Sequence, residues 1–337
     1  MLRVMRQLTS PPEALLDAGT RALHAGSFRG GLPPVDFSVL APRAMDRLLR
    51  HKRWLYLSLI SEEVMVAVAL VRLGYAANAF AFVHGRAEGR LLADRSALGL
   101  PVGVRVSDDP SLLAGEGRLP GARISVGRRG KGEELVLEAQ VHDVRISARL
   151  DAASAPPPIA AIASLPEDRA VATEKGALLR VRGEVRCKDR WFSLDGALGG
   201  YDYSNGLLPR RTMWRWGFAQ GWARSGERVA LNLVEGMSGA AECALWIDGE
   251  MFPLEEGRFV CNPERPLDPW EVRTEDGAVD LRFSPGGAHE DRTDLRYVRS
   301  RFLQPTGVYS GTIRVPDGRV LELREVLGVT ELQDVLW

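Results

Sequence analysis

The chain has 337 residues, of which 45% are hydrophobic, so it is long enough to bury a sizeable core, and its length predicts two domains. Lysine plus arginine and aspartate plus glutamate number 44 each, and the formal charge of zero argues against a nucleic-acid-binding protein or one attracted to anionic membranes. The 35 glycines and 20 prolines are typical of a β protein with many turns.

The N-terminal part predicts two short helices followed by strands. Residues 15–24 have helical spacing between two prolines and a glycine, and residues 43–53 are a second candidate. Residues 1–10 carry two arginines without a following apolar region, which excludes an ordinary signal peptide. The longest apolar run, residues 64–71, is too short to cross a bilayer and predicts a strand buried on both faces. We therefore expect a cytoplasmic protein without stable membrane insertion.

Further strands are indicated by side-chain alternation. Residues 144–150, 179–185 and 279–283 alternate apolar and polar side chains, which predicts strands with one buried and one solvated face. Asp-Gly pairs at 248–249, 276–277 and 317–318 suit the positive φ angles of hairpin turns. Long helical patterns between the strands are missing, which argues against a parallel sheet. The sequence predicts an all-β fold of antiparallel barrels or sandwiches.

A stretch rich in alanine and proline, residues 151–166, predicts a loop or domain junction, because its three consecutive prolines cannot donate to a strand ladder. We therefore expect an N-terminal β domain over residues 1–165 and a C-terminal β domain over residues 166–337. The basic, glycine-rich stretch 127–132 lacks the strand–loop–helix context of a phosphate loop and predicts an exposed hairpin tip.

The cysteines and histidines predict neither disulfides nor a metal site. Cys187, Cys243 and Cys261 form no C-x-x-C pair, so we expect three reduced thiols in a reducing compartment. The five histidines are scattered, without close ligand pairs. Since nucleotide fingerprints are also missing, no cofactor is predicted. The sequence predicts no nucleic-acid partner and leaves the oligomeric state open.

Residues 199–221 combine large aromatic side chains with polar groups. If Trp214 and Trp216 lie on a strand, both face one side and Arg215 faces the other. Asp202 is expected in a glycine-flanked loop just before that strand, where it would present a carboxylate to a pocket. Two structural alternatives stay open. In the first, the tryptophans are simply core residues. In the second, Asp202 caps a turn or pairs with one of the arginines that follow it.

Three functions fit this segment. The first is the binding of a small hydrophobic molecule of lipid or terpenoid type in a barrel cavity. The predicted ligand-binding residues are Tyr201, Asn205, Arg210, Arg211, Trp214 and Trp216, with an arginine pairing with an anionic head group. The second is an acid-catalysed hydratase, cyclase or isomerase acting on an unsaturated lipophilic substrate, with Asp202 as the acid and Tyr203 assisting by hydrogen bonding. The third is a structural or regulatory protein whose own side chains fill the pocket.

The same segment resembles the signature of the DUF2804 family. Lys52, Trp54 and Tyr56 in HKRWLYLSL and Gly307 in QPTGVYSG fit that family too. Residues 173–175 and 199–206 are more distantly similar to the hydroxyneurosporene synthase (carotenoid 1,2-hydratase) and AttH-like group. There an aspartate stands beside histidines, and here Asp202 stands between tyrosines. The resemblance implies two lipocalin-like antiparallel barrels, one in each predicted domain, and a small lipophilic partner.

Overall fold

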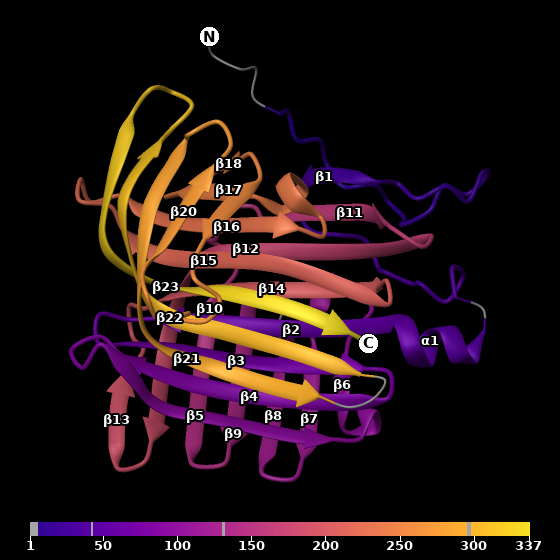
Figure 1. Cartoon of the computed structure of the whole chain (residues 1–337), viewed down its shortest axis with the longest axis horizontal. Helices are drawn as coiled ribbons and strands as arrows, with labels where there is room; N and C mark the ends of the chain where they lie inside the picture. The colour runs from indigo at the N-terminus through magenta and orange to yellow at the C-terminus, as the bar shows by residue number, and fades with distance from the viewer. Residues whose placement is uncertain (1–5, 42, 130–131, 295–297) are drawn as a thin grey trace.

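The fold is almost entirely antiparallel β in a computed structural model of the chain, which describes residues 6–41, 43–129, 132–294 and 298–337. Strands make up 63% of the described residues and helices 5%. Every pairing between named strands in the described residues is antiparallel (Figure 1). The predicted all-β, antiparallel fold class is confirmed, and the strands form two sheets.

The first sheet contains 14 strands in the described part of the chain. They are β1 (Gly26–Arg29), β2 (His51–Ile60), β3 (Val64–Leu73), β4 (Ala76–Gly85), β5 (Arg90–Gly99), β6 (Val104–Val106), β7 (Gly115–Leu119), β8 (Ala122–Arg129), β9 (Glu134–Val141), β10 (Val144–Asp151), β11 (Ile159–Leu165), β12 (Arg169–Cys187), β13 (Arg190–Ser193) and β14 (Leu198–Leu207). Their main order is β5-β4-β3-β2-β14-β12-β10-β9-β8-β7-β6. The sheet therefore joins β2 to β14, a strand far along the chain.

This first sheet curves until its two ends pack together, since β3, β4 and β5 contact β7, and β4 and β5 contact β9. The enclosed core consists of alternate residues, as on β2, where Leu55, Leu57 and Leu59 point inward. Tyr56 and Ile60, on the opposite face of β2, belong to the core shared with the second sheet. Strand β3 is buried on both faces from Val64 to Leu70, as predicted.

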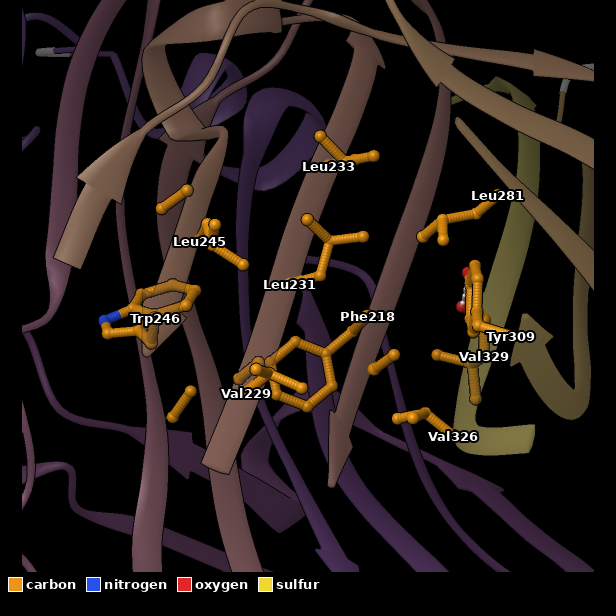
Figure 2. Close-up of a cluster of buried hydrophobic side chains, with 14 of the residues drawn as sticks. Phe218, Val229, Leu231, Leu233, Leu245, Trp246, Leu281, Tyr309, Val326 and Val329 are labelled. Carbon is orange, nitrogen blue, oxygen red and sulfur yellow. Dashed lines mark hydrogen bonds between the residues drawn. The ribbon is translucent and has the colours of Figure 1, made fainter. Parts of the chain in front are cut away.

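The second sheet contains nine strands in the described residues, in the order β18-β17-β16-β15-β23-β22-β21-β20-β19. They are β15 (Arg211–Trp222), β16 (Arg228–Gly236), β17 (Ala244–Ile247), β18 (Glu250–Pro253), β19 (Gly257–Val260), β20 (Trp270–Thr274), β21 (Val279–Asp294), β22 (Arg299–Arg314) and β23 (Val320–Leu336). Figure 2 shows side chains of β15–β17 and β21–β23 filling its core, among them Phe218, Leu231 and Tyr309. The Asp-Gly turns at 248–249, 276–277 and 317–318 connect paired strands of this sheet, as predicted.

The helical elements are short. They are α1 (Ala44–Arg50) and the 3-10 turns η1 (Pro101–Gly103), η2 (Pro110–Leu112) and η3 (Gly239–Glu242). The predicted helix at 43–53 is confirmed as α1, although its last residues begin β2. The predicted helix at 15–24 is wrong. There the Asp17 carboxylate accepts from the backbone N–H groups of Gly19 and Thr20, which closes a turn, and Leu16 bridges Leu23.

The predicted loop at 151–166 is too long, because only its proline-rich first half is irregular and the apolar residues after it form β11. The change of sheet comes after Leu207, whereas the domain boundary at 165 and 166 stays a prediction. For the hairpin tip at 127–132, β8 and β9 pair as expected up to Arg129 and Glu134. Residues 130–131 of that tip and residues 1–5 of the signal-peptide prediction lie outside the described residues. Cys187, Cys243 and Cys261 are all free.

Candidate ligand cavity between the two sheets

A cavity of about 420 Å³ lies between the two sheets, where β21–β23 cross in front of β2–β4 in Figure 1. The first sheet contributes the face that points away from its own enclosed core. The aromatic walls are Trp54, Tyr56, Tyr75, Phe80, Trp214, Trp216, Phe302 and Trp337. Leu98, which is 63% exposed, also lines the cavity, so this side opens to solvent. The cavity therefore lies between the two sheets rather than inside either one.

Two stacked tryptophans join the sheets at this cavity. The rings of Trp54 on β2 and Trp214 on β15 are 5.9 Å apart between centroids and inclined by 13°. The indole N–H of Trp54 donates to Asp202 Oδ2 at 3.3 Å, and that of Trp214 donates to Glu331 Oε1 at 2.7 Å. Each indole thus holds a carboxyl group of its own sheet, and the stacked pair brings the two carboxyl groups to one end of the cavity.

Asp202 belongs to a buried ion cluster. It pairs with the ammonium of Lys175 on β12, which also contacts Glu242 Oε2 at 3.1 Å. The Ser204 hydroxyl donates to Asp202 Oδ1 at 3.0 Å, and the Thr173 hydroxyl donates to Glu242 Oε2 at 3.1 Å. The cluster is built by β-strand periodicity, because every second residue of β12 and of β14 points toward the second sheet.

Burial and charge act in opposite directions within this cluster. Burial acts to lower the pKa of Lys175, but the neighbouring carboxylates of Asp202 and Glu242 outweigh it, and its pKa lies above the ordinary value. Burial raises the pKa of Glu242 despite the ammonium beside it. A lysine in this position holds its charge because two carboxyl groups compensate it.

Glu331 on β23 differs from Asp202 in its partners. Its oxygens accept from two neutral donors, the indole of Trp214 and the amide of Gln304, the latter at 2.8 Å. Burial raises the pKa of Glu331 to about 7, since these hydrogen bonds only partly offset it and the negative charge of Asp202 adds to it. Near neutral pH, a fraction of the Glu331 carboxyl groups is therefore protonated.

The Tyr56 hydroxyl experiences the charges of both carboxyl groups. Burial, together with the charges of Glu331 and Asp202, raises the pKa of Tyr56 well above its ordinary range. Its hydroxyl has no hydrogen-bond partner in the described structure. It therefore stays a neutral, buried donor beside two carboxyl groups.

Of the sequence-predicted site residues, Asp202, Trp214 and Trp216 line the cavity. Asp202 lies within β14, so the predicted loop is wrong there, and its ionic partner is Lys175 rather than Arg210 or Arg211. Arg211 instead lies 3.5 Å from Asp334 at the surface, and the backbone N–H of Arg210 donates to Glu167.

Tyr201, Tyr203 and Asn205 point to the other face of β14. The Tyr201 hydroxyl donates to Glu174, the Tyr203 hydroxyl donates to the Ser107 carbonyl, and the Asn205 amide donates to the Val35 carbonyl. In a strand, neighbours in sequence point to opposite faces, so Asp202 and Tyr203 reach different cores.

Sequence reasoning missed Lys175, Glu242, Gln304 and Glu331 as site residues. Lys175, Trp54 and Tyr56 belong to segments that resemble known families, but nothing in those segments marks them as site residues. The signal available for Glu331 was its position among alternating residues of a C-terminal strand, flanked two residues away by Val329 and Gln333. That pattern does not tell a buried carboxyl group from a solvated one.

Replacing Asp202 by Asn is expected to lower the free energy of unfolding by about 1–3 kcal/mol, because Lys175 then loses a charge-assisted contact in a buried place. Urea denaturation at pH 7.5 measures it. The control is Asp334→Asn, which breaks an exposed pair with Arg211 and should change stability by less than about 0.5 kcal/mol. Equal stability of both variants would contradict a bracing role for Asp202.

The topology and the cavity define a class, an all-β protein with two antiparallel sheets and a cavity between them. The chain matches the family described as "Domain of unknown function (DUF2804)" over residues 5–337. It therefore belongs to the DUF2804 family. Within the described residues, no helix has the length and apolarity that crossing a bilayer would require.

Two solved structures are similar to the chain at low sequence identity. An AttH-like protein of Nitrosomonas europaea has 11% identity and a TM-score of 0.49, with 84% of this chain and 92% of that chain covered. The kievitone hydratase of Nectria haematococca has 10% identity and a TM-score of 0.48, with 92% of this chain and 97% of that chain covered. No curated protein matches the sequence.

Proposed function

We propose that the protein binds a small, largely apolar molecule of lipid or terpenoid type in the cavity between its sheets. The observation that carries this proposal is the cavity itself, whose volume of about 420 Å³ falls in the range of small-molecule sites. Its walls are mainly aromatic and aliphatic, and four of its charged groups, Lys175, Asp202, Glu242 and Glu331, lie close together. Such a site holds an apolar body by burial and orients it through a few polar groups.

Among the sequence-predicted residues, Trp214 and Trp216 are the ones we assign to ligand contact, together with Asp202 at the polar end. Trp54 and Phe80 complete the aromatic wall. We also propose a reducing compartment, the cytoplasm, which the three free cysteines support.

Filling the cavity is expected to weaken ligand binding. Val71 lines the cavity from β3, and Val71→Trp places an indole in the space that an apolar probe would occupy. With 2-ethoxynaphthalene as the probe in isothermal titration calorimetry, we expect a loss of at least about 10-fold in affinity, which corresponds to ~1.4 kcal/mol.

The matched control is Val260→Trp, the same substitution at a residue of β19 that is 62% exposed, and it should bind like the unaltered protein. Equal affinity of the two variants for the probe would contradict binding in this cavity.

A second candidate function is acid-catalysed chemistry on an unsaturated lipophilic substrate, as in a hydratase, cyclase or isomerase. The observation that favours it is the pair of carboxyl groups, Asp202 and Glu331, at one end of an aromatic cavity. Proton transfer to a carbon–carbon double bond generates a cation, and aromatic faces stabilise cations through their quadrupoles. Turnover of unsaturated lipophilic compounds by the purified protein tests this candidate.

A further inference from the structure

Two carboxyl groups share the polar end of the cavity, and their partners differ in charge. Asp202 contacts the ammonium of Lys175. Glu331 accepts from neutral N–H groups, those of Trp214 at 2.7 Å and Gln304 at 2.8 Å. An ammonium stabilises a carboxylate much more than a neutral donor does. Asp202 therefore has a cationic partner, whereas Glu331 is buried among neutral donors, and this burial favours its acid form.

We propose that Glu331 is the proton donor of this cavity, that Asp202 is its carboxylate base, and that the substrate is an apolar molecule with an electron-rich carbon–carbon double bond. This inference rests on the second candidate function above and assigns roles within it. Two carboxyl groups in one site whose surroundings favour different protonation states divide acid and base work between them. The sequence alone pointed to Asp202 as the acid, and the side-chain contacts reverse that role.

The π electrons of the double bond take the proton of the Glu331 carboxyl group, which forms a new C–H bond and leaves a cation on the neighbouring carbon. Water then adds to the cation, and the oxonium passes its extra proton to the Asp202 carboxylate. In an isomerisation, Asp202 instead removes a proton from an adjacent carbon. The oxonium ion and the carbocation are both strong acids. The Asp202 carboxylate is therefore basic enough to take a proton from either, even though it is paired with Lys175. Solvent exchange through the open side returns the proton to Glu331.

The titration of Glu331 supports this division. Burial raises the pKa of Glu331 to about 7, so a large fraction is protonated at neutral pH, and the fraction falls as the pH rises. The charged and titratable groups that line the cavity with it are Tyr56 from β2, Tyr75 between β3 and β4, Lys175 from β12, Asp202 from β14, Glu242 from η3 and Asp291 from β21. Among them, the negative charge of Asp202 raises the pKa of Glu331 and the ammonium of Lys175 lowers it.

The aromatic side chains lie where a cation would form. The Trp54–Trp214 stack holds both carboxyl groups at its indole N–H edges, so these two rings lie next to the proton donor and the base. Trp216 from the second sheet and Tyr56 from the first pack edge to face, with ring centroids 5.4 Å apart. A cation there gains from the rings and from the negative charge of Asp202.

The test uses 2-(vinyloxy)naphthalene, whose hydrolysis begins with protonation of the terminal vinyl carbon and yields fluorescent 2-naphthol and acetaldehyde. The variants are Glu331→Gln and Asp202→Asn, which keep the side-chain shapes. The matched control is Glu322→Gln, the same substitution at an exposed residue of β23 that pairs with Arg224. Binding of 2-ethoxynaphthalene, the saturated analogue, is measured for every protein.

We expect the unaltered protein to hydrolyse the probe faster than buffer, with a rate that falls as the pH rises above about 7. Glu331→Gln should hydrolyse the probe at least about 100-fold more slowly while still binding the saturated analogue, because its amide cannot supply the proton. Asp202→Asn should slow hydrolysis of the probe by about 10-fold or less, since Asp202 acts after the slow protonation of carbon. Glu322→Gln should be unchanged.

Binding without hydrolysis, or a rate that depends on Asp202 and not on Glu331, would overturn the assignment. Failure of every protein to bind either naphthalene would count against the proposed function instead. The infrared carbonyl band of a protonated carboxyl group, measured at pH 6 without a ligand, then identifies which residue is the acid. This band should titrate near pH 7 and disappear in Glu331→Gln. A band that disappears in Asp202→Asn and survives in Glu331→Gln would overturn the proposal.

Discussion

Replacing Lys175 by Met is expected to lower the free energy of unfolding by about 3–5 kcal/mol, the largest effect of any single substitution considered. Lys175 is 3% exposed and contacts both Asp202 and Glu242, so its loss leaves two carboxyl groups in a buried place without their counter-ion. Methionine fills a similar volume, so the change isolates the charge. Urea denaturation at pH 8, where carboxyl groups ionise most readily, measures it.

Two controls separate this charge effect from general disruption. Lys188→Met makes the same substitution at an exposed residue just beyond β12, and it should change stability by less than about 0.5 kcal/mol. In the triple variant with Asp202→Asn and Glu242→Gln, the buried carboxylates are gone, so most of the lost stability should return. A Lys175→Met protein within about 1 kcal/mol of the unaltered one would show that the buried charges are solvated in some other way.

The second large effect concerns pH. The pKa of Glu331 is about 7 in the folded protein and has an ordinary value of 4.5. The folded state thus holds the proton more tightly than the unfolded state, and this stabilisation is complete below about pH 4.5 and is lost as the pH rises through 7. At about 1.4 kcal/mol per pKa unit, the loss between pH 5 and pH 8 is roughly 2–3 kcal/mol. Glu331→Gln should remove it.

The measured quantity is the stability difference between Glu331→Gln and the unaltered protein at the two pH values. Burial lowers the pKa values of His51 and His84 to about 4, so their contribution is lost as the pH falls below about 6.5. Both proteins contain these histidines, and their effect cancels in the difference. Glu322→Gln should give a difference that does not depend on pH. The same pH-independent result for Glu331→Gln would mean that Glu331 has an ordinary pKa.

The fold class follows from the sequence because its signals are local. Side-chain alternation reports which face of a strand is buried, and Asp-Gly pairs report hairpin turns, so β10, β12 and β21 and the turns of the second sheet could be predicted. The helix at 15–24 failed because spacing alone cannot show that the Asp17 carboxylate bonds to the backbone of a turn. Strand β11, in the apolar half of residues 151–166, was likewise missed, because the prolines before it led to the prediction of a loop.

The site could be predicted only in part, because its polar end is assembled from strands far apart in sequence. Asp202 was identified from its own segment, and Trp214 and Trp216 from theirs. The ionic partner Lys175 comes from β12, and Glu331 from the last strand, and nothing local links them. Whether a carboxyl group meets an ammonium or an indole depends on sheet order. For the same reason, the roles of Asp202 and Glu331 follow from the contacts and not from the sequence.

The pairing of β2 with β14 has a consequence for how the protein folds. Leu57 lies opposite Tyr201, so this pairing closes a loop of more than a hundred residues before it gains any stability. Folding rates fall as contacts join more distant parts of a chain, so we expect slow folding. On the ribosome, β2 has an unpaired edge until residue 207 has emerged, and an apolar strand with an open edge is a template for aggregation. Heat-shock chaperones that cover such edges should raise the soluble yield more than a lower expression temperature alone.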